Sequence, residues 1–321
     1  MTSNAPSLPR NRLGRRGKGW RNICRYWQLY LFLLIPVALV IIFSYVPMYG
    51  VTLAFKDYRA KKGILGSPWA NPWYKYFEQF FNGYYFGRLL RNTLLINVID
   101  LIFGFPAPII LALLLNELRH ERYKKIVQTF SYLPHFISWV TLSGLFIQLL
   151  SPSTGPVAAL TRALGGTPYY FMGRVETFRW VLVVTNIWKS VGWSSIIYLA
   201  ALSGVDQEMY EAALIDGATR FQRVWYITLP SIFPTITIML ILQSGSILND
   251  NFDQVYNMMN DAVYRVSNVL GVYTYDLGLK NLSNAGLAKS TAVGLFKNVI
   301  ALILVLTTNT ISKKISDNGI W

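Results

Sequence analysis

Hydrophobic residues along this chain gather into six long runs separated by polar segments. Each run is about 18 to 25 residues long. That is enough for a helix rising 1.5 Å per residue to cross an apolar bilayer core about 30 Å thick. The pattern therefore predicts an all-α membrane protein with six transmembrane helices. The runs cover about Leu29–Tyr49, Asn92–Leu115, Ile126–Leu150, Trp180–Leu202, Ser231–Leu248 and Ser290–Ile311.

Composition agrees with a membrane protein. Hydrophobic residues make up 53% of the 321 residues, charged residues make up 14%, and the mean hydropathy is +0.35. Such a chain has too few polar residues to cover a soluble surface. With the single cysteine Cys24 and the two histidines His120 and His135, it also has too few ligands for a structural zinc or iron–sulfur site, so we expect no metal.

The net charge of +15 could indicate nucleic acid, but its distribution favours a membrane surface. Seven of the 30 Lys and Arg residues precede the first hydrophobic run. A basic tail at this place is typical of a cytoplasmic segment that contacts anionic lipid. A signal peptide would share this pattern. However, the run is long enough to span and no small-residue cleavage signal follows it, which favours an uncleaved anchor.

Placing the N-terminus in the cytoplasm makes the loops alternate sides. Of the Lys and Arg residues, 15 then fall in the short inner segments and 13 in the long outer loops. Long loops count for little in setting orientation, so this distribution supports the topology. We therefore expect a multi-pass protein of the plasma membrane with both termini inside, and the segment 206–230 in the cytoplasm.

Four regions follow from this topology. They are a basic cytoplasmic tail (1–28), a first transmembrane helix with an external loop (29–91), a core transmembrane domain (92–311) that includes the segment 206–230, and a second cytoplasmic tail (312–321).

The segment Glu211–Pro230 is a polar, weakly hydrophobic stretch between two of the runs. Residues 206–216 lack Gly and Pro and are rich in helix-forming residues, which predicts a short helix that Gly217 ends. A second helix is predicted by a hydrophobic stripe at Phe221, Val224, Trp225 and Thr228, opposite Arg220 and Arg223. Pro230 is expected to end that helix and to open the next span.

The spacing of residues in this segment resembles the EAA loop of permease subunits in bacterial ATP-driven (ABC) importers. The matching positions are Glu211, Ala212, Ala213, Gly217, Ile227, Leu229 and Pro230, and the form that includes Asp216, Gly217 and Ala218 is similar to the carbohydrate branch. Within it, the resemblance is closest to permeases for complex oligosaccharides or polysaccharides. The resemblance implies the MetI-like permease fold and a cytoplasmic loop that docks on an ATPase subunit.

The same resemblance implies the partners. They are a second permease subunit, two ATPase subunits and an extracellular, lipid-anchored solute-binding protein. ATP and Mg would be bound by the ATPase, and no cofactor by this chain, because the sequence has no GxxxxGK[ST] phosphate loop. Neither histidine has a nearby serine or cysteine arrangement that suggests a nucleophile, so we do not expect an enzyme.

Polar residues inside the spans indicate a substrate path. Asn186, Lys189, Ser190 and Trp193 recur at helical spacing in the fourth run, and Gln243 and Ser246 lie in the fifth. Amides, hydroxyls and an indole are the groups that bind sugar hydroxyls and sugar rings. Importers related to the maltose system bind sugar on the two helices that flank the EAA loop, which implies the same role here. Alternatively, these groups form hydrogen bonds between helices.

Three ionisable residues lie within the runs at similar depth: Asp100, Lys189 and Lys297. A lone charge inside a bilayer costs about 2.5 to 3.5 kcal/mol on insertion scales, so each charge is expected to pair or to face water. We hypothesise that Asp100 neutralises one lysine and that the other attracts an anionic or strongly hydrogen-bonding sugar, such as a uronic-acid oligosaccharide. The alternative is a purely structural ion pair.

The sequence thus predicts the permease of an oligosaccharide importer, with two alternatives left open. The cargo could instead be a peptide or an organic anion, which other branches of the same superfamily carry. The chain could also be a membrane scaffold or sensor that contacts an ATPase and transports nothing.

Overall fold

The computed structural model describes residues 25–280 and 283–316, and the regular elements of these residues are all helices. The chain divides into two compact units, residues 1–52 and 53–321. The predicted basic tail at 1–28 lies almost wholly outside the described residues. Half of the predicted tail at 312–321 lies outside them as well.

The first unit contains a long apolar helix. α2 (Trp27–Val40) continues through a π-helical turn into α3 (Val46–Met48). The helical stretch from Trp27 to Phe55 has 29 residues, an 18-residue window within it has a mean hydropathy of 2.6, and Pro36 lies inside it without ending it. By length and composition, this confirms the first predicted span.

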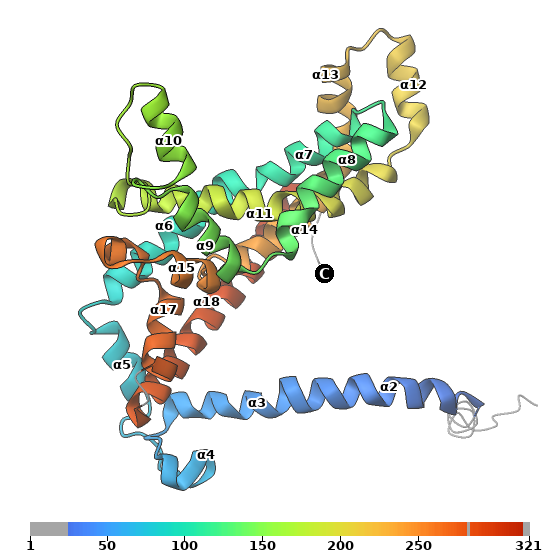
Figure 1. The fold of residues 1–321 in the computed structure, drawn as a ribbon. Coiled ribbons are helices and arrows are strands. Elements are labelled where there is room, and N and C mark those ends of the chain that lie inside the picture. Colours follow the sequence, from blue (N-terminus) through green and yellow to red (C-terminus); the bar gives the residue numbers. More distant parts are fainter. Residues whose placement is uncertain (1–24, 281–282, 317–321) are drawn as a thin grey trace, which may run out of the picture. The chain divides into compact units, whose positions relative to one another are not determined.

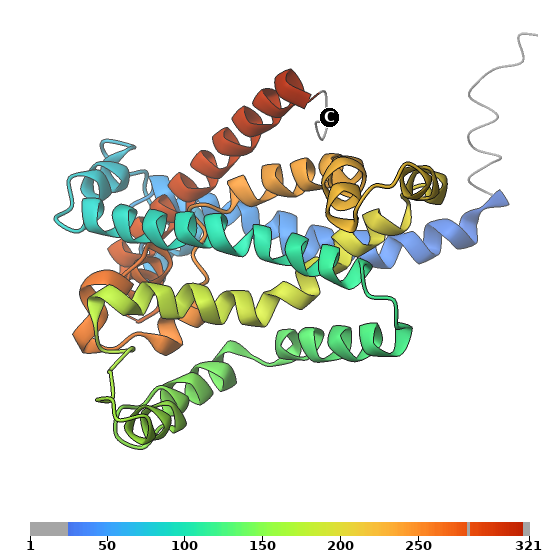
Figure 2. The same cartoon turned by 90° about the horizontal axis from the view of Figure 1, so that it is seen from above.

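The second unit is built on long helices that run beside one another (Figure 1). α11 packs against α6 and α7, and α14 packs against α18. Seen from above, α11 lies between α6–α7 on one side and the pair α8–α9 on the other (Figure 2). The framework consists of α6 (Phe86–Gly104), α7 (Pro106–Asn116), α8 (Glu121–Tyr132), α9 (Trp139–Leu149), α11 (Val175–Ser203), α14 (Leu229–Gly245) and α18 (Asn284–Ser316).

Shorter helices connect this framework. Before α6 come α4 (Gly63–Gly66) and α5 (Lys75–Phe81), and α10 (Pro156–Ala163) lies between α9 and α11. The loop between α11 and α14 holds α12 (Gln207–Ile215) and α13 (Arg220–Arg223). The segment between α14 and α18 holds α15 (Phe252–Met258), α16 (Tyr264–Ser267) and α17 (Leu270–Tyr275).

Close packing fixes α11 in the middle of the unit. A cluster of buried residues at its C-terminal half joins Tyr198 and Leu202 to Ile109 of α7 and Ile232 of α14. On another face, Gly192 lies so near α8 that a Cβ at this position would be 2.1 Å from the carbonyl oxygen of Ser131. The helices around α11 therefore hold its polar residues in fixed directions.

The third predicted span, Ile126–Leu150, is not one straight helix. The stretch Glu121–Phe136 and the helix α9 meet at an angle of 103°. Pro134 cannot continue the hydrogen-bond ladder, Ile137 is extended, and Ser138 caps α9 by accepting a hydrogen bond from the Thr141 amide at 3.3 Å. A proline followed by an N-cap thus turns one hydrophobic run into two helices.

The predicted count of six spans is only partly met. In the described residues, four helices are long and apolar enough to cross a membrane, or five if the bent pair is one span. The remaining predicted span lies in α11, which has 29 residues. Polar side chains along α11 lower its hydropathy, so its crossing stays a prediction.

Candidate coupling loop and membrane cavity

The segment between α11 and α14 folds as two short helices joined at a glycine. Asp206 caps α12 by accepting a hydrogen bond from the Glu208 amide at 3.0 Å. Gly217 ends α12 with φ +76°, a conformation that only glycine adopts without strain. The Ala218 amide donates a hydrogen bond to the Ala213 carbonyl at 2.9 Å, which caps the C-terminal end of α12. The predicted break at Gly217 is confirmed.

The N-terminal end of α13 is also capped. Thr219 and Gln222 form a capping box, in which each side chain bonds to the backbone of the other residue. Figure 1 shows α12 and α13 projecting beyond the ends of α11 and α14. We call this element, residues 206–230, the coupling loop. Since both helix ends are capped by its own residues, the loop is a preformed surface.

The coupling loop presents its matching residues, and large hydrophobic ones, on its surface. Glu211, Ala212, Asp216 and Pro230 are exposed, and Ala213, Ala218, Ile227 and Leu229 are partly buried. Ile215 is 86% exposed and Phe221 is 74% exposed. Hydrophobic side chains at this exposure, on a rigid support, are typical of a surface that a partner covers.

The structure corrects one feature of the loop. Pro230 does not end the second helix, because the helix runs without a break from Arg220 to Gly245. The turn Val224–Thr228 is π-helical, with hydrogen bonds spaced one residue wider than in an α-helix. This spacing accommodates the missing amide of Pro230. The second half of the loop and α14 are therefore one continuous rod.

Sequence reasoning missed a bond that ties the loop to this rod. The Tyr210 hydroxyl of α12 lies 2.9 Å from the hydroxyl of Thr228, which is fully buried. Either hydroxyl can donate. The two halves of the loop are thus linked by a side-chain contact besides the turn, and nothing in the spacing of the two residues indicated it.

A polar cavity lies between α6, α11 and α14. It has a volume of about 240 Å³ and is lined by Asp100, Asn186, Ser190 and Gln243, together with Gly104, Phe105, Pro108, Ser194, Tyr198 and Met239. A second cavity of about 130 Å³ shares Asp100 and Gln243 with it and adds Ser246, Asn249, Asn251 and others. Four of the six predicted path residues are therefore brought together.

Hydrogen bonds hold the polar groups of the cavity in place. The Asn186 amide donates to Asp100 Oδ1 at 2.9 Å, and its carbonyl oxygen accepts from Asn251 at 3.3 Å. Asp100 keeps a second carboxylate oxygen for another donor. Carboxylate, amide and hydroxyl groups around one space can bind several sugar hydroxyls at once. Asn251, which belonged to an outer loop in the sequence prediction, was not expected here.

Lys189 and Trp193, predicted on the same face, lie elsewhere. The Lys189 ammonium donates to the backbone carbonyls of Pro134, His135 and Ile137, at the bend between α8 and α9. The Trp193 ring stacks on His135 with 4.6 Å between ring centroids. These two residues therefore hold the bend against α11. The predicted polar face is divided between the cavity and this structural contact.

The predicted pairing of Asp100 with a lysine is wrong. Lys297 pairs instead with Asp250 at 3.3 Å, and Lys189 is held by carbonyls. In the described part of the chain, Asp100 has no ion-pair partner. Asp250 lies just beyond the outer end of the fifth run and Lys297 lies seven residues inside the sixth, so depth counted along the sequence did not indicate this pair.

Replacing Lys189 with methionine should destabilise the bend. Three carbonyls would lose a charged donor, and hydrogen bonds to charged groups contribute about 1.5 to 3 kcal/mol each. We expect a lower melting temperature of the purified protein, measured by intrinsic fluorescence. Lys125→Met, on the exposed face of α8, removes the same charge and should leave the melting temperature unchanged. Equal melting temperatures for Lys189→Met and the original protein would contradict the role given to Lys189.

Comparison with known proteins gives consistent results. A family model described as "Binding-protein-dependent transport system inner membrane component" matches residues 13–317. Protein LplB of Bacillus subtilis is 45% identical over 293 residues, which cover 91% of both chains. The polygalacturonan/rhamnogalacturonan transport system permease protein YteP of the same organism is 42% identical over 296 residues, covering 92% of this chain and 91% of YteP.

Solved structures agree with these sequence relatives. A chain of a bacterial ABC transporter involved in the import of the acidic polysaccharide alginate is 39% identical and has a TM-score of 0.83, with 93% of this chain and 99% of that chain covered. A second structure, of the bacterial alginate ABC transporter in complex with an alginate pentasaccharide-bound periplasmic protein, gives 40% identity and the same TM-score, with 94% and 99% covered.

Proposed function

Since the chain belongs to the family of binding-protein-dependent transport system inner membrane components, we propose that it is one half of the membrane path of an ATP-driven oligosaccharide importer. The family indicated by the spacing of residues 211–230 is thereby confirmed, as is the all-helical permease fold. The proposed assembly has a second permease subunit, two ATPase subunits that bind ATP and Mg, and an external binding protein. Both termini lie in the cytoplasm in this proposal.

The observation that carries this proposal is the polar cavity between α6, α11 and α14. Asp100, Asn186, Ser190 and Gln243 converge on one space within otherwise apolar helices. Polar groups at membrane depth are costly unless they pair or line a path. Here they offer donors and acceptors suited to sugar hydroxyls, and the coupling loop joins the two helices, α11 and α14, that carry three of them.

We propose that the cargo is an acidic, polysaccharide-derived oligosaccharide. The support for its acidity comes from relatives, one named for polygalacturonan and rhamnogalacturonan and one for alginate. The support expected from the intramembrane lysines is gone, because neither lysine lines the cavity and Asp100 does. In this chain, the cavity would therefore bind hydroxyls, and a carboxylate of the cargo would lie away from Asp100.

Uptake by the reconstituted importer tests the cargo. Proteoliposomes with the binding protein outside and ATP inside should accumulate labelled uronic-acid oligosaccharides in preference to neutral oligosaccharides of the same length. Preferential uptake of neutral sugars would contradict the acidic cargo. Uptake of peptides or organic anions alone would contradict a sugar importer. Absence of all uptake in a complex that hydrolyses ATP would favour the scaffold alternative.

Substitutions in the cavity test the path. Gln243→Ala removes one polar partner of the cargo, and a single hydrogen bond contributes about 0.5 to 1.5 kcal/mol, so we expect uptake efficiency to fall about tenfold or less. Ser244→Ala, one residue away, is the matched control, because the Ser244 hydroxyl bonds to the Ile241 carbonyl of its own helix and does not line the cavity. Equal uptake by both variants would contradict the proposed path.

A further inference from the structure

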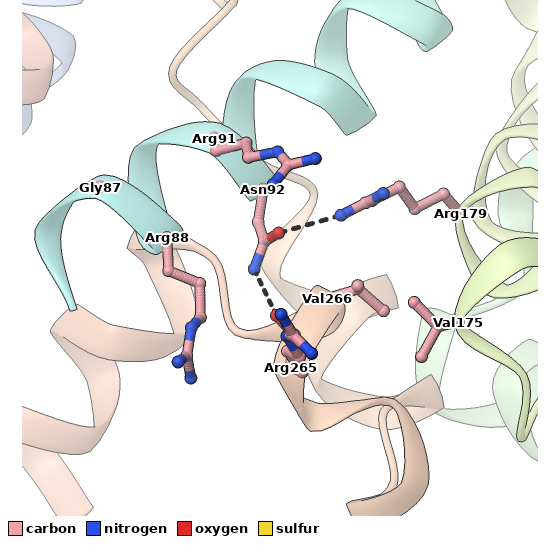
Figure 3. Close-up of a pocket in the computed structure, with 8 residues that line it drawn as sticks. All are labelled: Gly87, Arg88, Arg91, Asn92, Val175, Arg179, Arg265 and Val266. Carbon is pink, nitrogen blue, oxygen red and sulfur yellow. Dashed lines mark hydrogen bonds between the residues drawn. The ribbon is translucent and has the colours of Figure 1, made fainter.

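A second pocket, outside the cavity, is lined by four arginines. It has a volume of about 400 Å³ and lies where the first turns of α6 and α11 meet α16 (Figure 3). Its lining consists of Gly87, Arg88, Arg91, Asn92, Val175, Arg179, Arg265 and Val266, and it includes no carboxylate. In the predicted topology this end of α6 and α11 is on the outer side of the membrane.

Asn92 links the helices that line the pocket. It is 2% exposed, and its side-chain oxygen accepts a hydrogen bond from Arg179 Nη2 at 3.0 Å. Its amide donates to the carbonyls of Arg265 at 2.9 Å and Asn268 at 3.0 Å. Figure 3 shows the Asn92 side chain between Arg179 and Arg265. The buried side chain of Asn92 thus holds the Arg179 guanidinium of α11 and the backbone of α16 beside each other in the lining of the pocket.

The arginines of this pocket lack an anionic partner. Across the described residues, none of the four forms an ion pair. Arg179 Nε is buried without a hydrogen-bond acceptor, which leaves an unsatisfied donor of a charged group. Arg88 lies near the rings of Tyr84 and Tyr85 at 6.0 and 5.5 Å. Like charges that line one pocket repel each other, and an anion that binds among them would relieve the repulsion.

Guanidinium groups favour anions that offer paired oxygens, carboxylates among them. Their planar pairs of N–H donors match the two oxygens of a carboxylate, and such bidentate bonds are stronger than neutral hydrogen bonds. An outer pocket with four guanidinium groups therefore fits carboxylates.

A packed layer separates this pocket from the cavity. Along α6, the buried Ile96 lies between Asn92 and Asp100. Along α11, the buried Leu182 lies between Arg179 and Asn186, and both belong to one cluster of buried residues. Cargo in the cavity therefore does not reach the arginines through this chain. The carboxylates that fill the pocket must come from a molecule resting on the outer face.

We propose that the four-arginine pocket receives acidic side chains of the external binding protein. This inference rests on the proposed function, because it needs the importer to have such a partner. A related importer has been solved in complex with its periplasmic protein, and charge pairs at a docking interface raise association rates and fix the orientation of the partner. The pocket orients the binding protein over α6 and α11.

Binding measurements on the whole complex test this inference. The complex is placed in nanodiscs of zwitterionic phosphatidylcholine, so that no anionic headgroup competes, and is titrated with the binding protein that supports uptake. Arg265→Glu, at an exposed arginine, should weaken binding about tenfold or more at low salt, and the difference should shrink at high salt. Lys61→Glu, another exposed outer residue with the same charge change, should bind as the original protein does.

Three results would overturn the inference. The first is equal binding by Arg265→Glu and the original complex at every salt concentration. The second is binding of the oligosaccharide alone, without the binding protein, to the original complex and not to Arg265→Glu. This result would make the pocket a cargo site. The third is that no binding protein binds the original complex or supports its uptake, which would contradict the proposed function itself. Unchanged basal ATP hydrolysis by Arg265→Glu shows that the variant is assembled.

Discussion

Replacing Glu211 with alanine is expected to abolish ATP-driven uptake while leaving the complex assembled. Glu211 is exposed on α12, and in the described part of the chain its carboxylate bonds to no other residue. An exposed substitution of this kind changes stability by about 0.5 kcal/mol or less. A loss of uptake therefore measures contact with a partner, which we propose to be the ATPase subunit.

The control lies on the same helix. Glu208→Ala removes an identical side chain from the first turn of α12, at a position outside the matching pattern, and should transport as the original protein does. Uptake and ATP hydrolysis are measured together in proteoliposomes. If Glu211→Ala couples hydrolysis to uptake as well as Glu208→Ala does, the docking role of the loop is wrong.

A substitution at Gly217 should also block uptake, but it acts by changing the backbone of the loop and not by removing a side chain. Proline cannot adopt φ +76° and has no amide to donate to the Leu214 carbonyl, a bond of 3.1 Å here. Gly217→Pro should therefore misplace α12 relative to α13 and block uptake. Gly217→Ala keeps the amide and meets no atom within 4 Å, so it bears only the strain of the left-handed conformation, about 1 to 2 kcal/mol. It should retain part of the uptake.

The correction at Pro230 explains how a movement of the loop would reach the cavity. Because Arg220–Gly245 is one unbroken helix, the second half of the coupling loop and Gln243 belong to the same rod. The first half is tied to this rod by the contact between Tyr210 and Thr228. A rigid-body displacement of the loop by an ATPase would thus be passed to α14, as expected for alternating access.

The coupling loop could be predicted from the sequence because its signals are local. The glycine between two helical patterns predicted where α12 ends within a few residues of chain. The capping box of Thr219 and Gln222 is an equally local signal that the prediction did not use. The bend at Pro134 was missed because the hydrophobic run continues through it, and prolines are tolerated inside transmembrane helices. The N-cap Ser138 was the signal that a new helix begins.

The ion pairs could not be predicted in the same way. Counting residues from a helix end gives the depth of a side chain and leaves its direction around the helix open. Asp100 and Lys189 lie at similar depth, but α11 turns Asn186 toward Asp100 and turns Lys189 toward the bend. Each charge was expected to pair or to face water: both lysines have polar partners, and Asp100 lines the cavity.

Replacing Asp250 with alanine is expected to destabilise the protein by about 3 to 5 kcal/mol, the usual effect of breaking a buried ion pair. The Asp250 side chain is fully buried and pairs with Lys297, whose side chain is 14% exposed. Both carboxylate oxygens also accept from the Gly271 amide, at 3.0 and 3.1 Å. The carboxylate thus joins the segment between α14 and α15 to α17 and α18, and its loss leaves an uncompensated ammonium.

The double variant Asp250→Ala, Lys297→Met separates charge from packing. If the stranded ammonium causes the loss, the double variant should be more stable than Asp250→Ala alone, with the remaining deficit due to the Gly271 amide and the space left by the carboxylate. Melting temperatures of the purified protein measure both, and about 3 kcal/mol should appear as a fall of several degrees. A double variant no more stable than the single one would mean that Lys297 reaches water without Asp250, and a stranded ammonium would not be the cause of the loss.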